Sequence, residues 1–169
     1  VAWPPRWQSK KLGGFSHAVL GVTFPAGLQT LDLGLPFKHP IKGVQWPEGL
    51  ETLNLGGSFN RPLREVMCPT GLKTLSLGYC FDQALDGVAW PDGIRELIFG
   101  IAFDHSIEEG NWPRELRHID LGWDFSQPID KVRWPDYLKT LTLEDGLSCG
   151  VADVTWPRRL RTLQVGNRI

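Results

Sequence analysis

An aromatic residue followed by proline recurs along this chain at a nearly constant interval. The dipeptides begin at residues 3, 24, 46, 68, 90, 112, 134 and 156, so the interval is 21 residues once and then 22 residues six times. Tryptophan occupies the first place except at Phe24 and Cys68. A fixed period of this length indicates a solenoid, in which each repeat packs only on its neighbours.

Each repeat reads W-P-x-x-L-x-x-L-x-L-G-x-x-F-x-x-P-I-x-x-V-x, with the tryptophan as position 1. The segment L-x-x-L-x-L is typical of the strand of a leucine-rich repeat, and its leucines face the core. Glycine at position 11 allows a sharp turn after the strand. The return to the next tryptophan is too short and too rich in proline for a helix. We therefore expect a leucine-rich-repeat-type solenoid that is mainly β. It has one parallel sheet of short strands, returns of turns, extended and 3₁₀ segments, and little or no α-helix.

The repeat covers residues 1–169, which we interpret as a single solenoid of about eight units. Proline fixes the backbone where the chain re-enters the sheet, and we expect each tryptophan to stack on its equivalent in the next unit. A ladder of tryptophans could instead bind sugar rings, but Phe24 and Cys68 substitute in this column as in a packing position. Neither end of the sequence has a polar capping unit, so we expect further repeats or a partner to cover the ends.

Three segments carry a resemblance to a known family. They are FNRPL (59–63), FDQAL (81–85) and FSQPI (125–129), each followed by x-x-V-x and then Trp-Pro or Cys-Pro. These segments resemble FNIP-type repeats, a branch of the leucine-rich repeats that is abundant in protists and algae, and the tryptophan form resembles arrays from dinoflagellates. The resemblance implies a solenoid that binds proteins, and it supplies no catalytic residues. By analogy it also suggests an accessory subunit of an organellar assembly, photosynthetic complexes included.

Two units depart from the repeat. Lys10 replaces leucine at position 8 of the first unit, which is also one residue shorter than the others. In the seventh unit Glu144 replaces the glycine and Gly150 replaces the proline. Local distortion is expected at both places.

Composition and motifs exclude several classes of function. The formal net charge of −1 gives no general attraction to nucleic acid, and no apolar run is long enough to span a membrane. No phosphate-binding loop, metalloprotease helix, nucleophile elbow or C-x-x-C motif occurs. We therefore expect no enzymatic activity and no cofactor.

Cysteines and histidines give weaker indications. Cys68, Cys80 and Cys149 fall at different repeat positions and form no disulfide framework, which favours reduced thiols and an intracellular or organellar setting. His17 and His39 both occupy position 16 of adjacent units, where they could hold a metal ion. No third ligand is evident, so we expect exposed loop histidines and no metal site.

Two rows of side chains are candidate partner-binding sites. Position 6 carries a cation in five successive units, which we call the position-6 row: Lys73, Arg95, Arg117, Lys139 and Arg161. The acids expected to neutralise this row are Asp92, Glu96, Asp120 and Asp136. The alternatives are a solvated, ion-paired face and a docking surface for an acidic protein.

The second row is apolar and lies at position 12, just past the strand. This position-12 row consists of Leu35, Tyr79, Ile101 and Trp123. Position 9 adds Ile98, where most other units carry a polar residue. Such a cluster is typical of an interaction hot spot if it is exposed, although position 12 could instead fold under the loop as core.

The sequence therefore predicts a non-catalytic solenoid that binds other protein subunits, as a scaffold or an accessory subunit of a larger assembly. A free-standing module that binds carbohydrate or another ligand through Tyr79 and Trp123 is the alternative.

Overall fold

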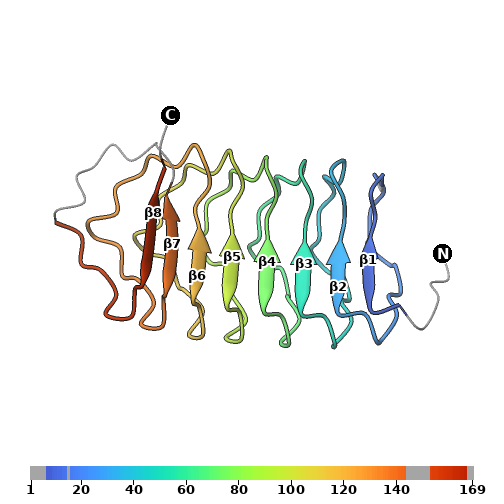
Figure 1. Ribbon diagram of the computed structural model, residues 1–169. Helices are drawn as coiled ribbons and strands as arrows, with labels where there is room; N and C mark the ends of the chain where they lie inside the picture. Colours follow the sequence, from blue (N-terminus) through green and yellow to red (C-terminus); the bar gives the residue numbers. More distant parts are fainter. Residues whose placement is uncertain (1–6, 15, 144–152, 167–169) are drawn as a thin grey trace.

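The computed structural model describes residues 7–14, 16–143 and 153–166, and it shows one parallel sheet of eight short strands (Figure 1). Neighbours in the sheet are neighbours in the sequence. The strands are β1 (Ser9–Lys11), β2 (Thr30–Asp32), β3 (Thr52–Asn54), β4 (Thr74–Ser76), β5 (Glu96–Ile98), β6 (His118–Asp120), β7 (Thr140–Leu143) and β8 (Thr162–Val165). The predicted solenoid is confirmed. Within the described ranges there is no α-helix, and hence no helix that could cross a membrane.

The strands pair so that equivalent repeat positions lie side by side. Leu31 pairs with Leu53, and Leu53 pairs with Leu75. Each typical repeat then closes with three tight turns. In the third unit these are bonds from Leu50 N to Pro47 O, from Phe59 N to Gly56 O, and from Val66 N to Leu63 O. The proline, glycine and aliphatic positions of the repeat are thus the corners of one rung.

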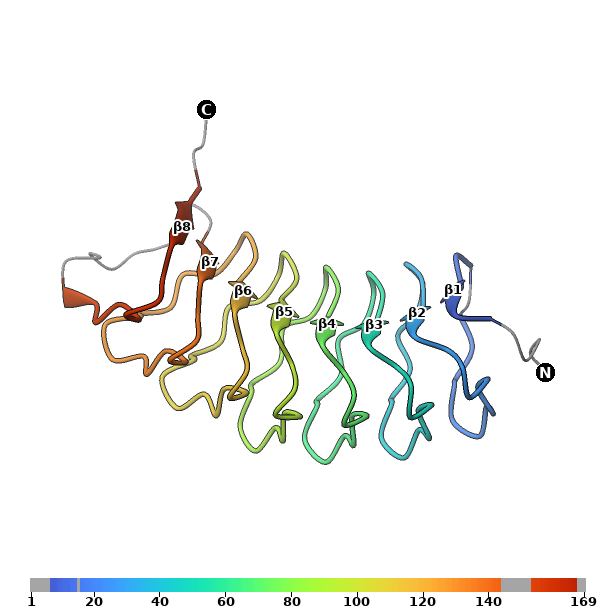
Figure 2. The ribbon, with the colours of Figure 1, turned by 60° about the horizontal axis from the view of Figure 1, so that its bottom comes forward.

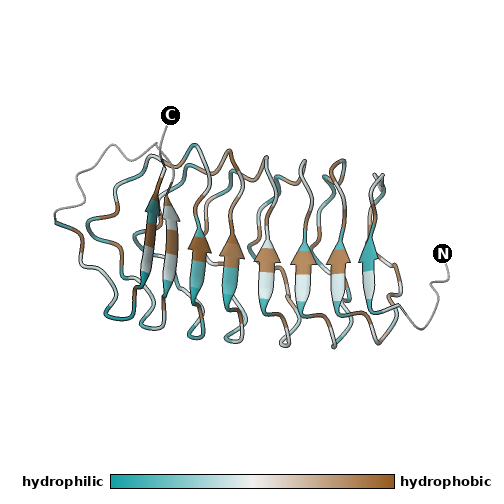
Figure 3. Cartoon of the chain, viewed as in Figure 1, coloured by the Kyte–Doolittle hydropathy of each residue, from teal (hydrophilic) through white to brown (hydrophobic). Residues whose placement is uncertain are grey.

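The core runs along the inside of the rungs as columns of identical residues. The phenylalanines at position 14 are at most 1 % exposed from Phe37 to Phe125. Leucines and isoleucines at positions 5, 8 and 10 are equally buried from β2 to β7. Figure 3 shows hydrophobic residues at the same level of neighbouring strands, whereas β1 is hydrophilic there.

Glycine at position 11 is required by the close approach of adjacent rungs. A Cβ atom on Gly78 would lie 1.8 Å from the carbonyl oxygen of Gly56, and the φ of Gly78 is 93°. Both the space and the left-handed backbone therefore exclude other residues.

The predicted stacking at the Trp-Pro corner is found for two pairs of neighbouring rings. Phe24 stacks on Trp46 with 5.8 Å between centroids, and Trp112 stacks on Trp134 at 6.4 Å. Trp134 is only 9 % exposed. These rings are packing elements, which argues against a tryptophan ladder that binds sugars.

The first unit keeps its place in the sheet despite Lys10. Lys10 pairs in register with Leu31, and its Nζ atom lies 4.1 Å from the centroid of the Trp7 ring. The side chain thus covers an aromatic residue of its own rung instead of entering the core. The departures at Glu144 and Gly150 lie outside the described residues.

Candidate interaction surfaces

The position-12 row is exposed. Leu35 is 63 % exposed, Tyr79 59 %, Ile101 48 % and Trp123 53 %. The interpretation of position 12 as core is therefore wrong, because the chain turns outward after the glycine and returns to the interior at position 14. The row thus presents four large apolar side chains along one edge of the solenoid.

Gly57 takes the place of a large side chain within this row. A Cβ atom on Gly57 would lie 2.9 Å from Cδ2 of Leu35 and 3.2 Å from Cδ2 of Tyr79. The two side chains therefore lean over the glycine from the rungs on either side. A hollow of about 140 Å³ lies beside them, lined also by Asp32 and Asn54.

Ile98 is not part of the same edge. It is the last residue of β5 and is half-buried, paired in register between Ser76 and Asp120. Its side chain lies on the outer face of the sheet, whereas the position-12 row lies beyond the carboxyl ends of the strands. The apolar cluster is therefore a row along one edge with Ile98 set back from it.

The position-6 row lies at the opposite, amino end of the strands, as the direction of the arrows in Figure 1 shows. Its backbone holds adjacent rungs together. The carbonyl oxygen of Lys73 accepts hydrogen bonds from the backbone nitrogens of both Arg95 and Glu96, at 2.7 and 3.1 Å. The side chains are not needed for this ladder.

Ion pairing of the position-6 row differs from the prediction. Lys73 pairs with Glu51 at 2.5 Å, and Arg117 with Glu115 at 3.5 Å. In the described part of the chain, no ion pair is formed by Arg95, Lys139 or Arg161. The four acids expected to neutralise the row were the wrong partners. Two of them are occupied locally: Glu96 accepts from Thr74 Oγ1, and Asp120 accepts from the backbone of Gly122.

A polar ladder at position 15 was missed by the sequence analysis. Asn60 accepts a hydrogen bond from the backbone nitrogen of Asp82, and Asp82 accepts one from that of Asp104. Asp104 in turn accepts from both the backbone and the hydroxyl of Ser126. The column of Asn, Asp, Asp and Ser at one repeat position was the available signal. This ladder links the returns of adjacent rungs by hydrogen bonds, so we assign it a role in stability and none in binding.

The pKa of Asp104 is affected by this ladder. Burial acts to raise it, but the hydrogen bonds from Ser126 and Gln127 and the nearby His105 together outweigh burial and lower it. A carboxylate that accepts several hydrogen bonds is stabilised in its charged form.

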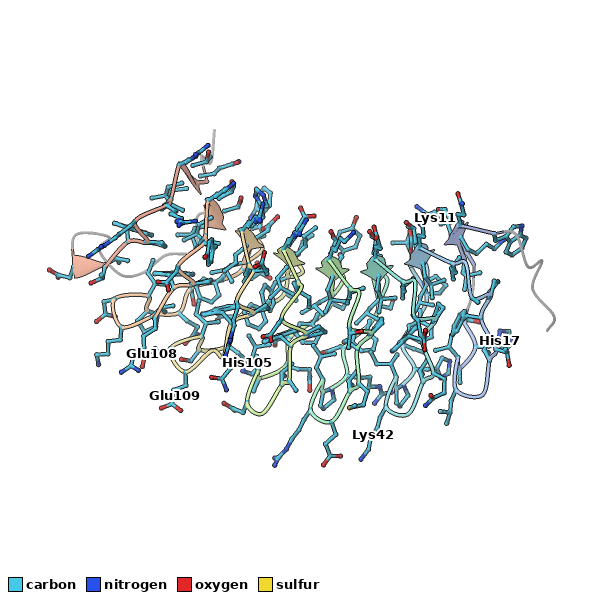
Figure 4. All side chains as sticks on the ribbon, turned by 90° about the horizontal axis from the view of Figure 1, so that it is seen from below. Lys11, His17, Lys42, His105, Glu108 and Glu109 are labelled. Carbon is cyan, nitrogen blue, oxygen red and sulfur yellow. The ribbon has the colours of Figure 1, made fainter. Side chains whose placement is uncertain are left out.

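The histidine pair does not build a metal centre. Nε2 of His39 lies 2.5 Å from the carbonyl oxygen of Ser16, and His17 is exposed on the adjacent rung. Among residues 7–14, 16–143 and 153–166 no three His, Cys, Asp or Glu side chains come together to hold a metal ion. Figure 4 shows that His17 lies at the amino-terminal end of the solenoid, with Lys11 on the sheet side and Lys42 on the returns.

The thiols offer no activated nucleophile in the described residues. Cys68 is mostly buried, and burial raises its pKa to about 11. Cys80 is exposed and free, and Cys149 lies outside the described residues. A thiol with a raised pKa is poorly reactive at neutral pH.

Comparison with known proteins identifies the repeat. Residues 37–80 match the model of the FNIP repeat. The chain is also similar to the crystal structure of CroV588, described as a novel circular LRR protein, with a TM-score of 0.83 and 27 % sequence identity. That similarity covers 92 % of this chain and 23 % of CroV588, so the chain spans about a quarter of its relative. A comparison with curated proteins gives no match.

Proposed function

We propose that this chain, which carries an FNIP-type repeat match at residues 37–80 and folds as a leucine-rich-repeat solenoid, is non-catalytic and binds a protein partner through the position-12 row. The observation that carries the proposal is the exposure of four large apolar side chains along one edge of the sheet. Large exposed apolar side chains grouped on a rigid surface are the usual anchors of protein interfaces.

The rigidity of the scaffold supports this proposal. The residues on both sides of the row are fixed by the backbone hydrogen bonds between adjacent strands and by the glycine turns. A partner would therefore meet a backbone that is already ordered, so less conformational entropy is lost on binding than with a flexible loop. Tyr79 and Trp123 are the strongest candidate anchors because aromatic residues are enriched at interface hot spots.

The experiment is a native pull-down from the source organism with the double variant Tyr79→Ser/Trp123→Ser. We expect wild-type protein to retain partners in stoichiometric amounts and the variant to lose them. Leu20→Ser/Met67→Ser is the matched control, since Leu20 is 61 % exposed and Met67 78 % exposed on other parts of the surface. Equal retention by the two double variants would contradict the proposed surface.

A finer form of the proposal is that the chain is an accessory subunit of a larger assembly. In that case the retained proteins should be the same set in each preparation and should co-migrate with the chain on a native gel. Variable, substoichiometric partners would contradict the accessory role but not the binding surface.

A second candidate function is carbohydrate binding, which is favoured by one observation. Tyr79 and Trp123 are aromatic, more than half exposed, and on the same row two rungs apart. Exposed rings can stack on sugar faces. A glycan array separates the two functions, because a protein-binding subunit should bind no glycan.

A further inference from the structure

A groove lies between the Trp-Pro corners of the last described rungs, away from the position-12 row. It has a volume of about 800 Å³ and is lined by residues 130–134, 136, 137 and 155–159. A second hollow, of about 480 Å³, lies toward the preceding corner and shares four lining residues with the groove: Arg133, Trp134, Asp136 and Tyr137. Figure 2 shows the corners of these rungs fanning apart, whereas the middle rungs lie parallel.

The groove opens where the repeat loses a glycine. Position 4 is glycine at residues 27, 49, 71 and 93, and a Cβ atom on Gly71 would lie only 3.2 Å from the carbonyl oxygen of Glu48. In the later units position 4 is Glu115, Tyr137 and Arg159. The Glu115 corner stays hydrogen-bonded to the preceding rung through Asp92, so the large groove lies only between the two later corners, where Tyr137 and Arg159 both line it.

Four cations line the groove and are exposed: Lys131, Arg133, Arg158 and Arg159. None of them forms an ion pair with another described residue. Two carboxylates, Asp130 and Asp136, share the lining. The groove thus carries an excess of positive charge in a chain whose formal net charge is −1.

Three aromatic residues, Trp134, Tyr137 and Trp156, are among those that line the groove. The guanidinium carbon of Arg159 lies 4.4 Å from the centroid of the Tyr137 ring, so the ring holds this cation in place. Trp134 is buried and Trp156 is half-buried at the two corners. An ordered guanidinium beside apolar surface is suited to a carboxylate on an apolar chain, because guanidinium groups bind carboxylates in a fixed geometry.

We propose that this groove binds an acidic, extended peptide segment of a protein partner, with carboxylates on Arg133, Arg158 and Arg159. The proposal rests on the proposed function, since it names the chemistry of the partner, but it concerns a separate surface. Charge complementarity carries it: four exposed cations that form no ion pair with a described residue line one groove.

A peptide is favoured over nucleic acid by the two carboxylates of the lining. Asp130 and Asp136 would repel a phosphate backbone, in which every unit is charged. They can accept hydrogen bonds from the amide groups of an extended peptide, whose acidic side chains are spaced apart. Single-stranded DNA therefore serves as the competing ligand in the test.

The test selects peptides from a phage-displayed random library on the full chain, and measures the affinity of synthetic copies by fluorescence anisotropy. We expect the selected peptides to be rich in Asp and Glu with an apolar residue between them. Arg133→Glu/Arg158→Glu should weaken their binding by about tenfold or more, and added salt should weaken it further. The matched control is Lys38→Glu/Arg64→Glu, which makes the same change of charge at two exposed cations outside the groove.

Several outcomes would overturn the proposal. They are selected peptides without acidic enrichment, equal loss of binding in the two charge-reversal variants, and tighter binding of single-stranded DNA than of the peptides with the same sensitivity to Arg133→Glu/Arg158→Glu. None of these touches the position-12 row, whose own test uses Tyr79 and Trp123. A negative result for peptide binding in the groove is therefore distinguishable from a negative result for the proposed function.

Discussion

The ring of Phe59 stacks on the ring of Phe81, with 6.3 Å between the centroids and 2° between the ring planes. The same contact continues from Phe37 to Phe125 at 6.0 to 6.3 Å. The column crosses five rungs without a break, and every ring in its interior touches two others. It ties the returns of five successive rungs together through ring-to-ring contacts.

Removing one ring from the middle of this column should be costly. We expect Phe81→Ala to lower the free energy of unfolding by about 3–5 kcal/mol, because it removes buried area and leaves a cavity between two rungs. Urea denaturation followed by tryptophan fluorescence measures the change. Tyr79→Ala, two residues away and 59 % exposed in the wild type, should cost less than about 1 kcal/mol. Equal midpoints for the two variants would show that the stacked column does not stabilise the fold.

The glycine turn gives a second prediction. Gly78→Ala places a methyl group against the carbonyl oxygen of Gly56 and forces a side chain into a left-handed backbone, so we expect a loss of at least about 2 kcal/mol. Gly27→Ala is the control, because a Cβ atom there meets nothing within 4 Å. The control should unfold at the same urea concentration as wild type or slightly above it. A neutral Gly78→Ala would mean that adjacent rungs can separate freely.

The sheet, its register and its core could be predicted because, at each of the repeat positions that form them, a single physical requirement selects the residue type. Leucine at position 8 and phenylalanine at position 14 are buried in every typical rung, and glycine at position 11 fits where nothing else does. When one residue type fills a repeat position in nearly every unit, that residue type indicates whether the position is buried or needs a left-handed backbone. The 22-residue repeat alone thus predicted the fold of the described residues.

Side-chain partners on the surface could not be predicted in this way. Proximity in sequence suggested Asp120 as a neutralising acid, but its carboxylate is held by Gly122 at the strand end. The groove was missed because it depends on positions 3, 4, 20 and 22, which vary from unit to unit and show no period. The exposure of position 12 needed the path of the backbone after the glycine, which the period does not specify.

The position-15 ladder predicts a dependence of stability on acid. The pKa of Asp104 is lowered in the folded protein, so its ionised form stabilises the fold above its unfolded pKa of about 4. That contribution is lost as the pH falls through the folded pKa. Asp104→Asn keeps an acceptor oxygen and cannot ionise. We expect wild type to exceed this variant in stability near neutral pH, with the difference shrinking below about pH 4.

Urea midpoints of wild type and Asp104→Asn over a range of pH test this prediction. Asp86→Asn is the control, because Asp86 is exposed and its carboxylate accepts none of the hydrogen bonds found in the described residues. Its difference from wild type should not change with pH in the same way. A difference for Asp104→Asn that stays constant down to acid pH would show that the ladder does not depend on the charge.

Two thiols of the chain should differ sharply in reactivity. Burial raises the pKa of Cys68 to about 11, whereas Cys80 is exposed at position 13. In a Cys149→Ser background, iodoacetamide near neutral pH should label Cys80 at least about a hundredfold faster than Cys68, because only the thiolate reacts, burial suppresses the thiolate of Cys68, and Cys68 is less exposed than Cys80. Peptide mass spectrometry at successive times gives both rates in one sample. In concentrated urea the two rates should converge, which is the control for intrinsic reactivity. Rapid labelling of Cys68 in the absence of urea would show that its rung opens readily, in conflict with a continuous core on either side of it.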